Sequence, residues 1–450
     1  MKRVILILGL VLLFAGSAAA APMGLGGYIY YGVDAGGAFD EYMKLYRFEV
    51  DGHFDYVTDT KVQFDNVAID QVHDANGYDF TQELEFNCEV YDPRHEGGTG
   101  KLIVAGIVDN GTPVHAGADH ATPWDVVLVD PDNPTTDYSK ANGNMLTNGR
   151  TWGAGDWQFY YAQMAMAAPP DWAGTSNGIS VLTVAESSGS YDVSAIYDAD
   201  DNGIVDDSAA EGTLISTDVS ICDSEFGKDG CLYQTYSQST SINSLIKIRK
   251  TWIDTGTPMK TTFFNAADNA IRFGDRTTMT QGLAVGPQET KPIVYLYQMD
   301  NVADTYTWTL WAMRDDDDNG SIDISPGSPD TFVQVWRDGE LGISLSRKLK
   351  YDGGDIEYYD HPNPDNQDVI IVAGYSGNDM FALELADNGL KAIAAHKISG
   401  LGTGIDAWPG GWHGFEIDMA GPVIPEPGTM LLLGTGVLGV LGYVRRRRMK

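Results

Sequence analysis

The chain has 450 residues, of which 29 are Lys or Arg and 63 are Asp or Glu, giving a formal net charge of −34 at pH 7. Binding to nucleic acid depends on basic side chains that neutralise phosphates, so this charge argues against nucleic acid as a partner. With 43% hydrophobic and 11% aromatic residues, the chain also differs from disordered proteins.

Residues 1–20 predict a secretory signal peptide. Lys2 and Arg3 precede an apolar stretch from Val4 to Ala15, and the run Ala18–Ala20 supplies the small residues of a cleavage site. The alternative, an uncleaved anchor, is disfavoured because spanning a bilayer needs about 20 apolar residues. Cleavage by signal peptidase after Ala20 would leave residues 21–422 as an extracytoplasmic domain.

The domain at 21–422 is expected to be all-β. Its short apolar runs alternate with period two and are separated by Gly, Asp, Asn and Pro, while helical periodicity is almost absent. The expected strands lie at 101–107, 125–129, 179–184, 191–197, 293–297, 308–313, 369–373 and 380–385.

Internal repeats accompany these strands. YDVSAIYDADDNGIVD at 191–206 aligns without gaps with WTLWAMRDDDDNGSID at 308–323, and weaker copies occur at 379–389 and 124–133. Units of this kind indicate a β-propeller with four-stranded blades, and six or seven blades would fill the domain. A pair of tandem β-sandwiches is the alternative, because it has similar strand statistics.

Two of the repeats carry closely spaced oxygen ligands after a strand. The candidate calcium ligands are Asp198, Asp200, Asn202, Ile204 and Asp206 in one copy and Asp315, Asp317, Asn319, Ser321 and Asp323 in the other, with Ile204 and Ser321 acting through their carbonyls. Acidic, solvated turns are the alternative.

This pattern resembles the first half of an EF-hand loop. It departs from that loop at position twelve, where Ala209 and Pro326 replace the closing glutamate. It is more similar to the shorter calcium loops of FG-GAP-type propellers and thrombospondin-type repeats, which implies a structural role for calcium.

The three cysteines are expected to divide into a pair and a single thiol. Cys222 and Cys231 flank a polar loop and are predicted to form a disulfide in an oxidising compartment. Cys88 alternates like a strand residue and is expected to be a small buried hydrophobe.

Two aromatic clusters are candidate carbohydrate contacts: Trp152 and Trp157 in one, and Trp408 and Trp412 in the other. Trp is also an ordinary residue of sheets and cores. The common hydrolase, metalloprotease, P-loop and dinucleotide motifs do not occur, so no catalytic residue is assigned. A glycosidase pair among the many carboxylates would be recognised only by its separation in space.

The tail combines three parts: Pro425-Glu426-Pro427, an uncharged Gly-rich segment at 429–444, and a cluster of arginines at 445–448. The segment is a marginal membrane span, and the arginines hold their end on the cytoplasmic side. Residues 423–450 closely resemble the PEP-CTERM sorting signal of Gram-negative bacteria. The resemblance implies that an exosortase, a membrane cysteine transpeptidase-like enzyme, recognises the motif. An ordinary tail anchor is the alternative.

Two functions are compatible with these features. The first is a secreted or cell-surface component of the exopolysaccharide or biofilm matrix, held transiently in the inner membrane before sorting. The alternative is a secreted hydrolase or lyase that acts on polysaccharide from a propeller scaffold.

Overall fold

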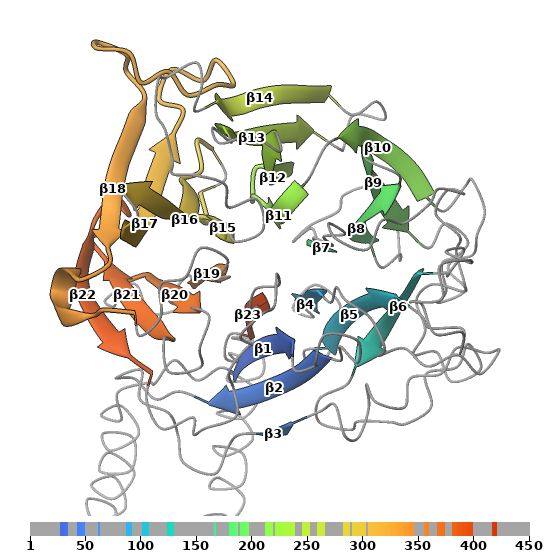
Figure 1. The fold of residues 1–450 in the computed structure, drawn as a ribbon. Helices are drawn as coiled ribbons and strands as arrows, with labels where there is room; N and C mark the ends of the chain where they lie inside the picture. Colours follow the sequence, from blue (N-terminus) through green and yellow to red (C-terminus); the bar gives the residue numbers. More distant parts are fainter. Residues whose placement is uncertain are drawn as a thin grey trace, which may run out of the picture.

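The structure is a computed structural model (Figure 1). It describes the backbone of residues 28–34, 43–49, 62–63, 87–91, 101–107, 124–129, 166–167, 180–187, 190–197, 212–218, 221–238, 245–252, 259–265, 282–288, 290–302, 305–345, 355–359, 367–373, 380–398 and 416–420. Side chains are described for residues 225–235, 248–250, 261–265, 282–288, 290–298, 307–345, 355–359, 367–373 and 380–398.

The described residues form six antiparallel sheets. One sheet has the order β23-β1-β2-β3 and contains Glu416–Ala420 (β23), Tyr28–Asp34 (β1), Met43–Glu49 (β2) and Val62–Gln63 (β3). The next contains Asn87–Tyr91 (β4), Lys101–Ile107 (β5) and Trp124–Val129 (β6). A third contains Met166–Ala167 (β7), Ser180–Ser187 (β8), Ser190–Tyr197 (β9) and Gly212–Asp218 (β10).

The remaining three sheets each contain four consecutive strands. The first consists of Ile221–Phe226 (β11), Cys231–Gln238 (β12), Leu245–Trp252 (β13) and Met259–Asn265 (β14). The second consists of Gly282–Val285 (β15), Val294–Val302 (β16), Thr305–Arg314 (β17) and Thr331–Arg337 (β18), followed by the short 3-10 helix Glu340–Gly342 (η5). The last consists of Asp355–Tyr359 (β19), Val369–Ala373 (β20), Phe381–Leu385 (β21) and Ala392–Lys397 (β22).

The six sheets are arranged around a common centre (Figure 1). One strand of each sheet lies nearest the centre: β4, β7, β11, β15, β19 and β23. Each of these strands contacts the next in this order, and β23 contacts β4, so the contacts form a closed cycle.

The cycle closes within a single sheet that contains both ends of the body. β1 pairs with β23 in antiparallel register from Tyr28↔Ala420 to Gly32↔Glu416. On its other edge β1 pairs with β2, from Tyr28↔Glu49 to Asp34↔Met43. Backbone hydrogen bonds therefore join the first strand that the structure describes to the last.

The expected all-β organisation is confirmed for the described residues, and the sequence repeat falls on equivalent strands of its sheets. The two aligned copies at 191–206 and 308–323 begin in β9 and β17, each of which is the third strand of its sheet counted outward. The weaker copies fall on β21 and β6, which are also third strands. The repeated sequence therefore marks equivalent positions in four sheets.

The predicted signal peptide at 1–20 and the sorting tail at 423–450 lie outside the described residues. Among the residues that the structure does describe, no helix combines the length and apolar character needed to cross a membrane.

The sheet β15–β18 buries apolar side chains on both of its faces. Along β16, Tyr295 and Tyr297 pack in one cluster with residues of the sheet β19–β22, such as Ile370. Val294 and Leu296 alternate with them and pack in a second cluster with residues of the sheet β11–β14, such as Phe264. Successive side chains of a strand point to opposite faces, so the period-two alternation supplies both clusters.

Two glycines, one at the start of β15 and one just after its end, differ in what surrounds them. A Cβ at Gly282, the first residue of β15, would lie 2.8 Å from the backbone nitrogen of Ile356 and 2.9 Å from the Cα of Asp355 in β19. At Gly286 the nearest atom to an added Cβ is the side-chain oxygen of Gln288, at 2.6 Å. The atoms that crowd an added Cβ at Gly282 are therefore backbone atoms, whereas the nearest atom at Gly286 belongs to a flexible side chain.

Gly282→Ala is therefore expected to lower the free energy of unfolding by about 1–3 kcal/mol, because two backbones would have to separate. Gly286→Ala is the matched control and should have a smaller effect, because the end of Gln288 can move. Urea unfolding of both variants measures the difference. Equal stabilities would contradict the close approach of β15 to β19.

Candidate functional site

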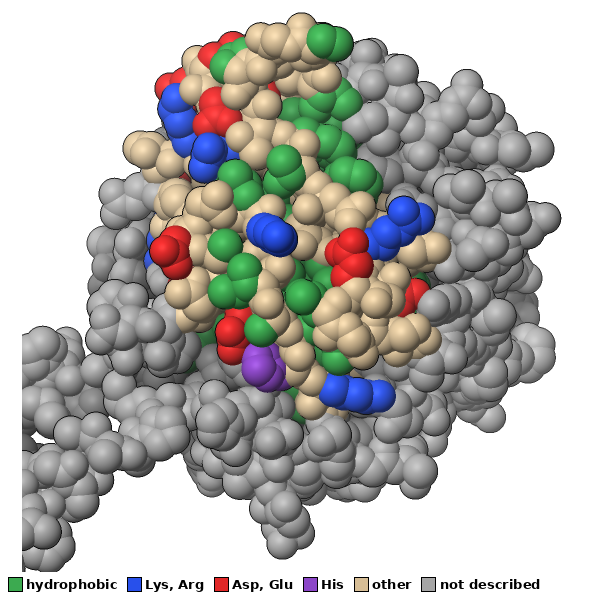
Figure 2. Space-filling model, turned by 90° about the vertical axis from the view of Figure 1, so that its left-hand side faces the viewer, with side chains coloured by type: hydrophobic (Ala, Val, Ile, Leu, Met, Phe, Trp, Pro, Cys, Tyr) green, Lys and Arg blue, Asp and Glu red, His purple; other side chains and the backbone are tan. Residues whose placement is uncertain are grey.

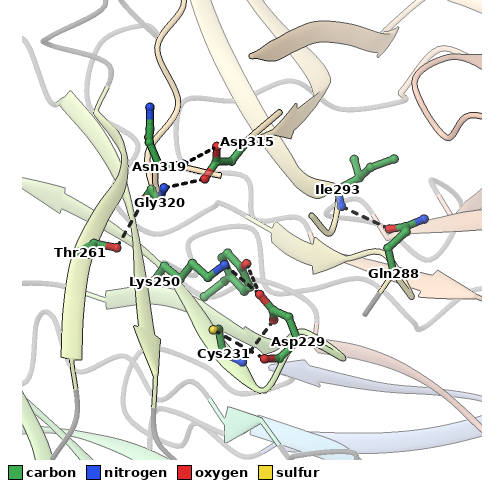
Figure 3. A network of polar contacts seen from close by, with 10 residues as sticks. Asp229, Cys231, Lys250, Thr261, Gln288, Ile293, Asp315, Asn319 and Gly320 are labelled. Carbon is green, nitrogen blue, oxygen red and sulfur yellow. Dashed lines mark hydrogen bonds and ion pairs between the residues drawn. The ribbon is translucent and has the colours of Figure 1, made fainter. Parts of the chain in front are cut away.

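The loop between β17 and β18 wraps around the carboxylate of Asp315. Asp315 is 6% exposed and accepts hydrogen bonds from the backbone N–H of Asn319 at 3.2 Å and of Gly320 at 2.7 Å (Figure 3). Asp318 and Gly320 have positive φ angles of 61° and 85°, which let the chain turn this sharply. The loop geometry is thus built around one buried acidic residue.

Three carboxylates converge in this loop. Oxygen atoms of Asp315, Asp317 and Asp330 all lie within 4.8 Å of one another. Asp330, immediately before β18, also accepts hydrogen bonds from the backbone N–H of Asp316 at 3.0 Å and of Asp323 at 2.8 Å. The sequence pattern does not predict Asp330 as a ligand, because this residue lies beyond the nine positions of the pattern. Its place just before a strand is the signal that could have indicated it.

The other three predicted ligands of this copy make local contacts. The carboxylate of Asp323 accepts hydrogen bonds from the backbone N–H and the hydroxyl of Ser325, both at 2.8 Å. The backbone N–H, followed by the hydroxyl, lowers the pKa of Asp323. The side-chain oxygen of Asn319 accepts from the N–H of Ser321 at 2.9 Å and from its hydroxyl at 2.7 Å.

Among the side chains that the structure describes, the basic groups near the loop contact Asp316 rather than the three clustered carboxylates. The Arg314 guanidinium lies 2.7 Å from the Asp316 carboxylate, and the Thr331 hydroxyl donates to the same group at 2.5 Å. Lys291 donates to the Asp316 carbonyl at 2.6 Å. Burial raises the pKa of Asp316, but these hydrogen bonds and cations outweigh burial and lower it.

The loop is also joined to the neighbouring sheet. The Thr261 hydroxyl of β14 donates to the Gly320 carbonyl at 3.4 Å (Figure 3). The Ile322 N–H donates to the Phe263 carbonyl at 2.6 Å. The Ile322 side chain is 5% exposed and packs with Phe263 and Phe264. One loop therefore holds together the outer strands of two sheets.

A second polar network lies close to this loop (Figure 3). Asp229, in the turn between β11 and β12, accepts a hydrogen bond from the Tyr233 hydroxyl at 2.9 Å and pairs with Lys250 at 2.9 Å. Its other oxygen accepts from the Cys231 N–H at 3.2 Å. Burial first, and then the charge of Asp229, raise the pKa of Tyr233, so its hydroxyl remains a donor.

The network is shielded from solvent and links the turn to β13. The side chains of Lys250 and Asp229 are only 12% and 10% exposed, and the Lys250 ammonium lies 5.3 Å from the centre of the Tyr233 ring. The largely shielded Lys250 ammonium is stabilised by both contacts, with the Asp229 carboxylate and with the face of the Tyr233 ring. These contacts stabilise the turn between β11 and β12. The Tyr233 hydroxyl stays protonated, so it is unsuited to act as a base.

The predicted disulfide between Cys222 and Cys231 does not agree with the hairpin register. Cys222 lies between Ile221 and Asp223, which pair with Tyr236 and Thr235, whereas Cys231 lies at the other end of β12. Four or five residues of strand separate the two positions, about 13–16 Å at 3.3 Å per residue. A disulfide needs Cα atoms about 4.4–6.8 Å apart, so this register keeps the cysteines too far from each other.

Several other candidate residues lie outside what the structure describes. These are the calcium loop from Asp198 to Asp206, the four tryptophans Trp152, Trp157, Trp408 and Trp412, and the motif Pro425, Glu426 and Pro427. Cys88 lies in β4, whose side chains are likewise not described.

Charges of both signs are mixed with apolar groups on one face of the described residues (Figure 2). His396 of β22 pairs with Glu384 of β21 at 2.8 Å, and both are partly exposed. The strongly negative charge of the chain is therefore not gathered into a single acidic patch on this described face.

Comparison with known families identifies the tail. Residues 423–448 match the PEP-CTERM protein-sorting motif. The predicted sorting signal is thereby confirmed, and it implies an exported bacterial protein that is processed by an exosortase and reaches the cell surface or the extracellular space.

Comparison of the rest of the chain is less informative. A search of curated proteins finds no match. Among solved structures, a mutant α-L-arabinofuranosidase from Fusarium graminearum, in complex with an iminosugar inhibitor, aligns with a TM-score of 0.38 and 9% identity. The alignment covers 69% of this chain and 80% of that chain. Likeness at this level carries no argument about activity.

Lys250→Met is expected to lower the free energy of unfolding by about 1–3 kcal/mol, because it leaves the partly buried Asp229 carboxylate without its cation. Lys391→Met, at an exposed position just before β22, is the control and should change stability by less than about 0.5 kcal/mol. Denaturant titration distinguishes the two. A Lys250 variant as stable as the control would show that the ion pair contributes nothing to stability.

Proposed function

We propose that this protein is an exosortase substrate of a Gram-negative bacterium and a structural or binding component of its exopolysaccharide matrix. The match of residues 423–448 to the sorting motif carries the proposal. Signal peptidase removes residues 1–20, the segment 429–444 holds the chain in the inner membrane, and exosortase then acts near Pro425. Proteins with such tails tend to accompany exopolysaccharide production, which supports a matrix role.

The body in this proposal is a six-bladed β-propeller. The cyclic contacts among the innermost strands, the sheet shared by β1 and β23, and the repeat on third strands support this fold over tandem sandwiches. In a propeller each sheet is a blade, and a blade completed by both chain ends closes the ring. Trp152, Trp157, Trp408 and Trp412 are proposed to contact the glycan.

Calcium is proposed to stabilise the loops after β9 and β17. The convergence of Asp315, Asp317 and Asp330 supports a hard cation at the second loop, because calcium is bound by 6–8 oxygen atoms. Asp330 supplies the closing carboxylate that position twelve lacks. Each carboxylate can accept about four hydrogen bonds or ligand contacts, so the backbone contacts described above leave capacity for an ion.

The alternative, a polysaccharide hydrolase or lyase, is favoured by one observation. Asp355 and Glu357 lie two positions apart on β19, so they share a face of a strand at the centre of the sheets. Release of reducing ends from isolated exopolysaccharide by the parent, and not by the Glu357→Gln variant, would favour the enzyme over the matrix component.

Glu426→Ala combined with Pro427→Ala is expected to block processing, so that the full tail stays in the inner membrane fraction. Cell fractionation with intact-mass analysis of the C-terminus measures this. Asp387→Ala with Asn388→Ala, in an exposed turn of the body, is the control and should be processed like the parent. Normal processing of the motif variant would refute sorting by an exosortase.

Calcium is expected to raise the melting temperature, because only the folded loop binds it. At a free calcium concentration one hundred times the dissociation constant, one site adds about 2.7 kcal/mol to the free energy of unfolding. Asp200→Asn with Asp317→Asn should remove most of this response, since the isosteric amide keeps the shape of the loop but loses charge. Magnesium should substitute poorly.

Asp387→Asn, an exposed aspartate in another turn, is the matched control and should retain the full calcium response. Melting curves with millimolar calcium and with chelator give the comparison. Identical melting curves of the parent protein with calcium and with chelator would show that the two loops are acidic turns that bind no calcium.

A further inference from the structure

The register of the closing sheet fixes where the sorting tail leaves the body. Ala420 ends β23 and pairs with Tyr28, the first residue of β1, while Tyr28 also pairs with Glu49, the last residue of β2. The opposite end of the same sheet carries Asp34 paired with Met43. The two ends of β1 are separated by about 20 Å, at 3.3 Å per residue.

Few residues connect this end of the sheet to the sorting motif. The matched motif begins at Val423, and Pro425 follows Ala420 by five residues. Five residues span at most about 17 Å even when fully extended. An enzyme that binds Pro425 and Glu426 is larger than this distance, so it must approach the end of the sheet where Ala420 lies.

The other end of the mature chain arrives at the same place. Cleavage after Ala20 would leave seven residues before Tyr28, a reach of about 25 Å at most. Both chain ends that come from the membrane therefore meet the body at one end of one sheet. The paired strands prevent this end from turning away while the tail is held.

We propose that the end of the closing sheet formed by Tyr28, Glu49 and Ala420 is the surface that the body presents to the exosortase. The partner is thus a membrane-embedded protein, and the body binds it in one orientation until the tail is cut. This inference rests on the proposed sorting function.

Photocrosslinking in cells tests the orientation. The full chain carries a photoreactive phenylalanine analogue in place of either Tyr28 or Asp34, and the host exosortase has its catalytic cysteine replaced so that the tail is bound but not cut. An adduct with the exosortase is expected at position 28 and at least tenfold less at position 34. Positions 49 and 43 provide a second matched pair if either variant fails to fold, which is judged by protease resistance of the exported, membrane-held protein.

The outcomes separate the inference from the sorting function. Equal adducts at both positions, or an adduct at position 28 with lipid alone, would overturn the proposed surface. Absence of a membrane-held precursor in these cells would instead refute sorting by the exosortase. A long Gly-Ser insertion after Gly421 should abolish the position-28 adduct, because the body is then no longer held close; an undiminished adduct would also overturn the proposal.

Discussion

The burial of apolar side chains on both faces of the sheet β15–β18 is the constraint on which the rest of the architecture depends. In β16, Tyr295 and Tyr297 need a neighbour on one side, and Val294 and Leu296 need one on the other. A row of such sheets would leave an apolar face exposed at each end. Contacts that run in a cycle remove both exposed faces, and the pairing of Tyr28 with Ala420 completes that cycle.

The sequence predicted the class of fold because the local signals are strong. Alternation along 191–197 and 308–313, with turn residues on either side, is visible without any knowledge of the neighbours. The repeat placed β9 and β17 in equivalent positions for the same reason. β12 and β13 were not predicted, since residues such as Gln234, Arg249 and Lys250 interrupt their apolar pattern, and the pairing of β1 with β23 has no local signal at all.

The candidate site shows a similar division. Asp315 and Asp317 were identified from their spacing, and they do converge, but Asp323 turns instead to Ser325 and Asp330 takes part in the cluster. The choice depends on the path of the chain between 323 and 330, which spacing cannot define. The predicted disulfide between Cys222 and Cys231 is wrong for the same reason. Nearness in sequence suggested this disulfide, whereas the register of β11 on β12 determines which residues lie opposite each other.

The closing sheet has a consequence for how the body folds during export. β1 is exported before β23, so their pairing, the longest in range among the described strands, can form only after β23 has been exported. Contacts of such high sequence separation slow folding and prolong the lifetime of unpaired strand edges, which are prone to aggregation. In the proposed sorting route, the tail is still held in the membrane when β23 is exported, so the body completes this final pairing while it is tethered. Retention in the membrane would then act as a folding aid as well as an address.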